Sequence, residues 1–128
     1  MNVYDLSADA VARMARVDLA TVDRKPDSLV GPFDFHGCDC GVASFVGQPP
    51  WELHNGGDEL IHILAGEVEL TVLTGLAAET RRLKVGDLAV VPQGRWHRNN
   101  AASGVTILFL TPREGGQHSW DDPRAAPQ

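Results

Sequence analysis

The sequence contains few of the residues that mark secreted or membrane proteins. Its 128 residues include two cysteines, Cys38 and Cys40, whose spacing of two residues fits a disulfide poorly. We therefore expect reduced thiols in a reducing compartment. No apolar run approaches the ~20 residues that span a bilayer, and the first nine residues lack the basic start and apolar stretch of a signal peptide. These absences predict a cytoplasmic protein that does not bind membranes.

Basic residues are also scarce and scattered. Eleven Lys and Arg stand against seventeen Asp and Glu, and the net charge of −6 is spread along the chain without a basic block. Nucleic acids and anionic membrane surfaces require clustered basic residues, so we expect neither as a partner. A hydrophobic content of 43% is ordinary for a globular protein, and this length is typical of one domain.

The pattern of apolar residues predicts an all-β domain preceded by one short helix. Ser7 suits the N-cap of a helix whose apolar stripe includes Val11 and Met14. Further along, short apolar runs alternate with Gly, Pro, Asn and Asp about every eight to twelve residues, which is typical of a β-sandwich or barrel. We predict strands at Leu29–His36, Gly41–Val46, Trp51–His54, Glu59–Ala65, Glu67–Leu73, Glu79–Lys84, Leu88–Val91, Arg95–Arg98 and Val105–Thr111.

These elements divide the chain into three parts. We expect a helix and lead-in at 1–28, the β-barrel domain at 29–112, and a C-terminal segment at 113–128 that is a loose tail or an arm packed on a neighbour. The apolar residues expected to face inward are Ile61, Ile63, Val68, Leu70, Val72, Leu88, Val90, Ile107 and Phe109.

Two polar clusters carry the residues suited to chemistry. In the first, Glu52 and His54 share one face of a strand, because side chains alternate. The Asn-Gly-Gly turn that follows lets Glu59 begin the next antiparallel strand close by. In the second, His97 stands just beyond an apolar strand and a turn that contains Gly94.

These clusters resemble the two sequence motifs of the cupin superfamily. The first motif is matched in its second half by His54, Glu59 and Gly66, and the second motif by Gly86, Pro92, Gly94 and His97. The resemblance covers roughly residues 40 to 111. It implies a small single-domain cupin with a double-stranded β-helix, or jelly-roll barrel, whose cavity holds a divalent metal. The chain departs from the pattern at Glu52, where the family has histidine, and at Ala101, where it has asparagine.

The resemblance implies that His54, Glu59 and His97 are metal ligands, with Glu52 in the place of the missing histidine. Two imidazoles and one carboxylate suit non-haem Fe(II), and the same donors also bind Mn, Ni or Zn. In the alternative, the cavity is metal-free and these side chains hydrogen-bond one another. Glu52 either joins the metal or turns aside to a backbone amide or to Arg95.

Three functions are compatible with this site. The first is a metal-dependent dioxygenase or isomerase acting on a small polar metabolite. The second is a non-catalytic module that binds or senses a small molecule. The third is a metal-free cupin in which Glu59 and His97 act as acid and base. The fold alone does not choose among them. We also expect a homodimer that uses the segment Leu29–Val46, because an open β-sandwich has edges to cover.

The other candidate residues are expected to have structural roles. His36, Cys38 and Cys40 share a strand face, where a softer metal site is the alternative to simple burial of the thiols. His62 has the opposite parity to Glu59 and should face away from the cavity, and His118 should be solvated.

Four residues near the two clusters complete the set. Trp51 and Trp96 are expected to pack in the core or at an interface. Arg95 and Asn99 share the parity of His97, so either can reach a substrate anion, although an exposed loop position is the usual one for arginine.

Overall fold

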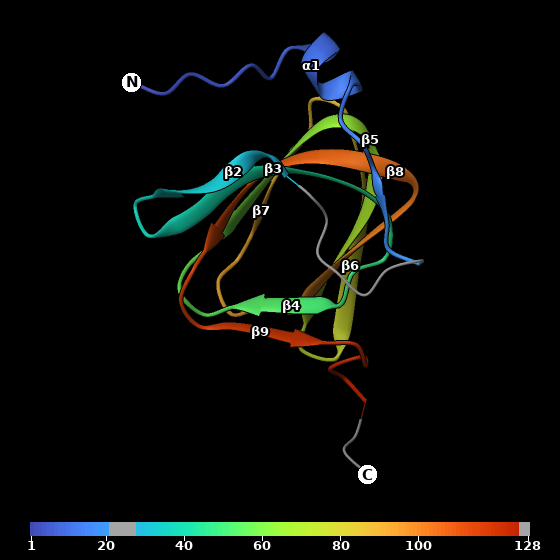
Figure 1. The fold of residues 1–128 in the computed structure, drawn as a ribbon. Coiled ribbons are helices and arrows are strands. Elements are labelled where there is room, and N and C mark those ends of the chain that lie inside the picture. The colour runs from blue at the N-terminus through green and yellow to red at the C-terminus, as the bar shows by residue number, and fades with distance from the viewer. Residues whose placement is uncertain (21–27, 126–128) are drawn as a thin grey trace.

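The computed structural model describes residues 1–20 and 28–125, and the expected boundary at 28/29 borders residues that lie outside this description. One helix, α1 (Ala8–Ala12), precedes the strands (Figure 1). The strands are β1 (Val17–Asp18), β2 (Ser28–Phe35), β3 (Cys38–Gly47), β4 (Trp51–His54), β5 (Glu59–Thr74), β6 (Ala77–Lys84), β7 (Leu88–Val91), β8 (His97–Pro112) and β9 (Gly116–Ser119). The all-β prediction is confirmed.

The helix α1 is short and lies outside the barrel (Figure 1). Ser7 is its N-cap, as predicted, and its hydroxyl oxygen accepts a hydrogen bond from the Ala10 N–H at 3.3 Å. Val11 is the buried residue of the helix. The expected stripe ends early, because the helix stops before Met14 and the chain then forms β1, which pairs in parallel with β3.

Two long strands, β5 and β8, pass through both sheets of the barrel. The first part of β5 pairs with β7 and with the end of β8, whereas its second part pairs with β6 and with the start of β8. The predicted strands on either side of Gly66 are therefore one bent strand, and the last two predicted strands are joined in β8. This arrangement is the double-stranded β-helix that the sequence predicts.

The bend in β5 depends on Gly66. Its φ of +71° lies in the left-handed region, and a Cβ at this position would stand 2.2 Å from the carbonyl oxygen of Gly104. The ladder between β5 and β8 shifts register on both sides of this point. Glycine is thus required where the strand crosses from one sheet to the other.

The core confirms most of the residues expected to face inward. Ile61, Ile63, Val68, Leu70 and Ile107 are buried, and Val72 and Phe109 pack partly buried against them. The prediction was wrong for Leu88 and Val90, which are 57% and 55% exposed. In β7 these two residues pair with His62 and Leu60, whereas Val91 pairs with Glu59, so Val91 faces inward instead.

The C-terminal segment is not a loose tail at residues 116–119. These residues form β9, which pairs antiparallel with β4 along its whole length (Figure 1). The strand satisfies the backbone groups of β4 that would otherwise form an open edge. This pairing places the C-terminal segment beside one of the two candidate motifs.

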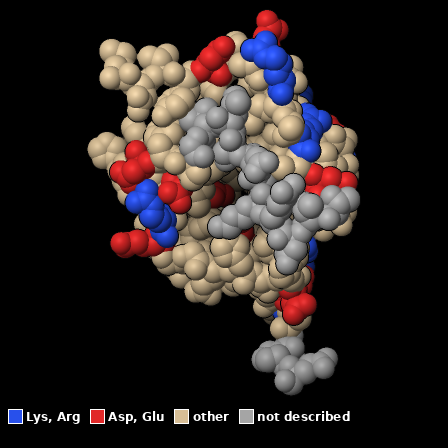
Figure 2. All heavy atoms as spheres, viewed as in Figure 1, with Lys and Arg blue, Asp and Glu red and all other residues tan. Residues whose placement is uncertain are grey.

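The surface in view carries charged groups of both signs. Figure 2 shows acidic and basic side chains intermixed over the face in view, with most of that face formed by other residues. Within residues 1–20 and 28–125, no helix is long and apolar enough to cross a membrane.

Candidate metal site

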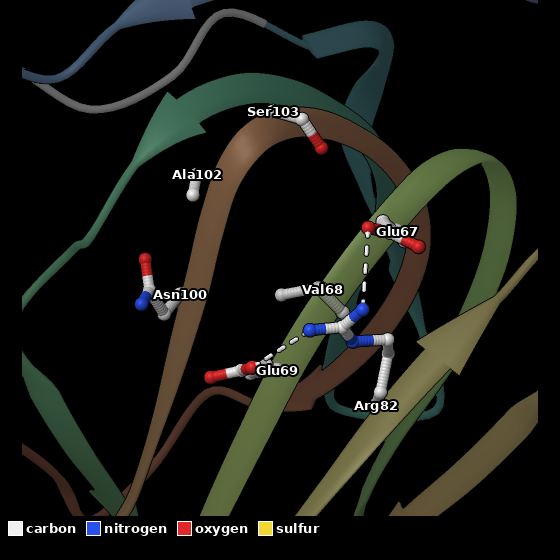
Figure 3. A pocket seen from close by; sticks show the side chains of 7 residues that line it. All are labelled: Glu67, Val68, Glu69, Arg82, Asn100, Ala102 and Ser103. Carbon is white, nitrogen blue, oxygen red and sulfur yellow. Dashed lines mark hydrogen bonds and ion pairs between the residues drawn. The ribbon is translucent and has the colours of Figure 1, made fainter.

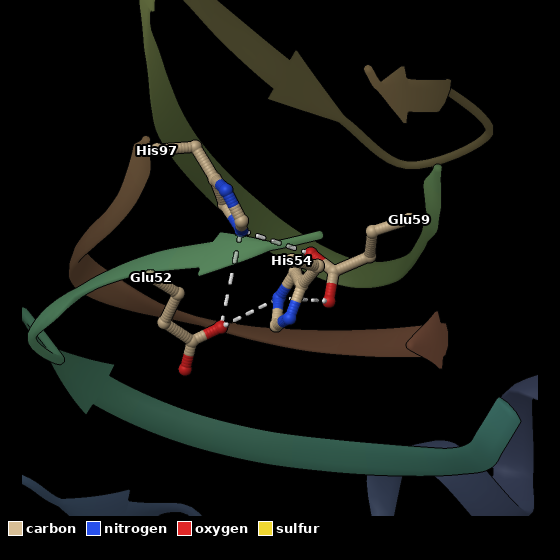
Figure 4. A group of neighbouring side chains, drawn as sticks. All are labelled: Glu52, His54, Glu59 and His97. Carbon is tan, nitrogen blue, oxygen red and sulfur yellow. Dashed lines mark hydrogen bonds and ion pairs between the residues drawn. The ribbon is translucent and has the colours of Figure 1, made fainter. Parts of the chain in front are cut away.

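Three strands bring the four candidate ligands together. Glu52 and His54 project from β4, Glu59 is the first residue of β5, and His97 is the first residue of β8 (Figure 4). One ligand atom from each of the four side chains lies within 4.8 Å of the others. His54, Glu59 and His97 are buried, and the Glu52 side chain is 30% exposed. The structure thus unites all four residues that the sequence predicts.

The turns of the two motifs are held together by hydrogen bonds. The Gly94 N–H donates to the carbonyl oxygen of His54 at 2.9 Å, and the Gln93 N–H donates to the Asp58 carboxylate at 2.8 Å. Gly94 has a φ of +74°, which glycine adopts without strain. These bonds explain why spacing within each motif matters, since each turn positions ligands of the other.

His97 has one ring nitrogen committed to the backbone. Its Nδ1 lies 3.3 Å from the carbonyl oxygen of Arg95, which can only accept, so Nδ1 carries the hydrogen. In the neutral ring Nε2 is then an acceptor, and it faces Oε1 of Glu59 at 3.1 Å. Two acceptors this close need a cation between them, either a proton or a metal.

His54 also has a ring nitrogen that faces carboxylate oxygens, and in this case two carboxylates are involved. Its Nε2 lies 3.2 Å from Oε2 of Glu59 and 3.4 Å from Oε2 of Glu52. Even so, neither ring nitrogen of His54 has a hydrogen-bond partner among the described residues, although both are buried. Nε2 of His54 thus faces two carboxylate oxygens at ion-pair distance without a well-formed hydrogen bond, which is a surrounding that a cation would complete.

The charges in the site are strongly coupled. Burial disfavours the charged form of His54, but the carboxylates of Glu52 and Glu59 outweigh burial and raise its pKa to about 9. Burial likewise disfavours the charge on Glu59, but His54, His97 and the Thr111 hydroxyl outweigh it and lower its pKa to about 2. Thr111 donates to Oε2 of Glu59 at 2.6 Å and fixes that carboxylate.

The donors fit a divalent cation. Ligand atoms at about 2.1 Å from one ion lie no more than about 4.2 Å apart, so a set that spans 4.8 Å needs only a small inward movement. The hydrogen bond from His97 Nδ1 to a backbone carbonyl is the contact that usually orients a metal-binding imidazole. His54, Glu59 and His97 can therefore hold a metal, and Glu52 can complete the set.

Glu52 points toward the imidazoles and also contacts a residue that the sequence did not indicate. Its Oε2 lies 3.8 Å from Nε2 of His97, while its Oε1 lies 3.6 Å from Nε2 of His118 on β9. His118 was expected only to be solvated, and it is 54% exposed, yet it borders the site. Histidine in a Gly-rich tail carries no periodic signal, so only the pairing of β9 with β4 reveals this contact.

The site opens into a cavity of about 630 Å³. Its walls are mainly apolar and include Phe45, Ile61 and Phe109, and Asn99 and Thr111 add polar groups. At the rim, Arg113 donates to Asp34 at 2.7 Å and to Asp39 at 3.0 Å, so its charge is already paired. The cavity has the size and the mixed lining of a small-molecule site.

A second hollow is much smaller and lies away from the candidate ligands. It has a volume of about 90 Å³ and is lined in part by Glu67, Glu69, Arg82 and Asn100 (Figure 3). The guanidinium of Arg82 lies between the two carboxylates, 3.9 Å from Glu67 and 3.2 Å from Glu69. These are exposed ion pairs of the kind that contribute little binding energy.

The remaining candidates have structural positions. His36, Cys38 and Cys40 do not form a ligand cluster, because in the described part of the chain the four residues above are the group that could hold a metal. Burial raises the pKa of the Cys40 thiol, as expected for a packed cysteine. His62 lies on the outer face beside Leu88, as its parity predicts.

The remaining residues near the two motifs divide between core and surface. Trp51 is buried under the guanidinium of Arg98, whose carbon lies 5.8 Å from the ring centre, so the expected packing role is confirmed. Arg95 is exposed, whereas Asn99 is buried and lines the cavity.

Comparison with known proteins identifies the fold. No curated protein sequence matches the chain. A cupin-2 domain containing protein from Shewanella frigidimarina has a similar structure, with 18% identity, a TM-score of 0.56, and coverage of 74% of this chain and 88% of that one. Hydroquinone 1,2-dioxygenase in complex with Cd²⁺ and 4-hydroxybenzonitrile is also similar, at 22% identity and a TM-score of 0.57, with 73% of this chain and 68% of that chain covered.

Oxalate oxidase is a further similar structure, with 20% identity, a TM-score of 0.54, and coverage of 62% of this chain and 45% of that one. At these identities the structures establish the fold. The model of the Cupin domain matches residues 46–111, which include both motifs and all four candidate ligands. On this match, which spans more than half of the sequence, the chain belongs to the cupin family.

Proposed function

We propose that this chain binds a divalent metal ion, Fe, Mn, Zn or Ni, through His54, Glu59 and His97, with Glu52 as a fourth ligand. The observation that carries the proposal is the buried Nε2 of His54, which faces two carboxylates and has no hydrogen-bond partner among the described residues. A metal ion at this point would bind the Nε2 atoms of His54 and His97 and would balance the charge of both carboxylates.

We further propose that the metal site acts on a small molecule as a dioxygenase or isomerase. The metal would supply a Lewis acid for substrate oxygens and, in the case of iron, a centre for dioxygen. The chain supplies dry apolar walls, and Glu52, the most exposed of the four ligands, stands where it can move a proton. Among similar structures, a hydroquinone dioxygenase and an oxalate oxidase support a reaction of this class.

The test begins with protein purified without chelator. Elemental analysis should find close to one metal per chain, and dioxygen uptake should appear with iron or manganese in the presence of oxalate or hydroquinone. The variant His97→Gln should lose metal, whereas His62→Gln, which alters a histidine outside the cavity, should retain it.

The other outcomes distinguish the alternative functions. Bound metal with a tightly retained small molecule and no turnover would show a binding or sensor module. A protein that takes up no metal at any pH above 7 would overturn the proposal and favour acid and base roles for Glu59 and His97.

A further inference from the structure

Asn99 is a buried polar residue that the metal site does not use. It lies on β8 two residues after His97, on the same face, and lines the cavity. Its side chain is 9% exposed, and its carboxamide oxygen is buried without a hydrogen-bond partner among the described residues. Such groups are rare in folded proteins, because burial removes water without supplying a replacement.

Asn99 lies at a defined distance from the candidate metal site, because it is on the same strand as His97. Two residues along a strand correspond to about 6.6 Å, so Asn99 lies roughly the length of a small molecule from His97. Its partner on β5 is Leu70, which belongs to the apolar core, and the cavity wall elsewhere includes Phe45, Ile107 and Phe109. Apart from Asp39 and Arg113 at the rim and Thr111 beside Glu59, the cavity therefore has its polar groups at the candidate metal site and at Asn99, with apolar surface over much of the remainder.

We propose that Asn99 binds the substrate and selects small, mainly apolar molecules with oxygen at one end and a hydroxyl or carboxamide group at the other. The first oxygen would occupy the metal site, so this inference rests on the proposed function. The second group would pair with the Asn99 carboxamide, which can both donate and accept. A methyl group at the same place would leave the carboxamide unpaired and would be rejected.

A purely structural role for Asn99 makes the opposite prediction about stability. If the carboxamide supports the fold, its removal lowers the thermal midpoint of the metal-free protein. If it is kept for a ligand, Asn99→Leu, which has the same number and branching of side-chain heavy atoms, removes an unsatisfied polar group and raises that midpoint. The matched control is Asn100→Leu, because Asn100 lines the small outer hollow instead of the cavity (Figure 3).

Binding provides the second measurement. Zinc-loaded protein is titrated by calorimetry with hydroquinone and with 4-methylphenol, which differ only in the hydroxyl or methyl group opposite the first oxygen. Wild type and Asn100→Leu should prefer hydroquinone by about tenfold or more. Asn99→Leu should lose this preference or reverse it, while its zinc affinity stays unchanged.

Each contrary result has a separate meaning. Any of three results overturns the role of Asn99. The first is that wild type and Asn99→Leu discriminate equally between the two phenols, and the second is that zinc-loaded wild type binds neither phenol. The third is a lower thermal midpoint for Asn99→Leu. Failure of wild type to bind any of the four metals, zinc, iron, manganese or nickel, contradicts the proposed function instead, and the stability measurement on metal-free protein still decides the role of Asn99.

Discussion

Glu52 and His118 face each other as register partners on β4 and β9, with 3.6 Å between Oε1 and Nε2. On its other side, Glu52 is the register partner of His97 on β8. The carboxylate thus stands in a row between two imidazoles that come from distant parts of the chain. The C-terminal strand thus places an imidazole beside the one candidate ligand that is partly exposed.

We predict that His118→Ala weakens metal binding by a factor of several up to about tenfold, because a contact that orients a ligand is lost. Gln117→Ala, a change at the neighbouring position of β9, should leave the affinity unchanged, since Gln117 pairs with Leu53 and not with a ligand. Competition with a chromophoric chelator measures both. Equal metal affinities for wild type and His118→Ala would show that the contact with His118 does not orient Glu52.

Substitution of Glu52 itself tests whether it is a ligand. Glu52→Gln keeps the shape and removes the charge, so the metal affinity should fall by about tenfold or more. Glu52→His restores the family pattern and should preserve binding. An unchanged affinity and pH dependence in Glu52→Gln would instead indicate a site of three residues.

The metal-free protein should be most stable in mildly acidic solution. The raised pKa of His54 contributes stability fully below pH 6.5, and this contribution is lost as the pH rises toward about 9. The lowered pKa of Glu59 contributes stability above pH 4.5, and this contribution is lost as the pH falls toward about 2. Thermal unfolding in the presence of EDTA should therefore show both contributions between pH 4.5 and 6.5. In His54→Gln the decline above pH 6.5 should be smaller.

Gly66→Ala should destabilise the fold by about 3 kcal/mol or more, because it combines left-handed backbone strain with a clash against the Gly104 carbonyl. Gly75→Ala is the matched control, since Gly75 has a φ of +80° but open space around its Cβ position. That variant should cost only about 1 kcal/mol. Urea denaturation measures the difference, and equal losses would show that the crossing of β5 tolerates a side chain.

We also predict a homodimer, in which the segment Leu29–Val46 takes part. Leu88 and Val90, which face outward and are more than half exposed, offer further apolar surface. Sedimentation at micromolar concentration should give about twice the chain mass of 13.8 kDa. A species of the chain mass alone would contradict this prediction.

The sequence predicted the grouping of the four candidate ligands better than the outer parts of the fold. Parity placed Glu52 and His54 on one face, and motif spacing placed Glu59 and His97 opposite them, because short turns leave little freedom. The run Leu88–Val91 has four apolar residues in succession, so it carries no parity, and the register with β5 decides which of them face inward. The strand β9 was missed because its four residues have no apolar pattern and β4 supplies its stability.

Because β5 and β8 run through both sheets, neither sheet can swing away from the other as a rigid body without breaking these strands. The cavity therefore keeps a fixed shape and does not open and close by movement of the two sheets. If the cavity takes a small molecule, as proposed, its entry would depend on rotation of side chains that line the cavity at the surface, such as the exposed Trp120. Such exchange would occur at the rate of side-chain motion, while the four candidate ligands keep their positions.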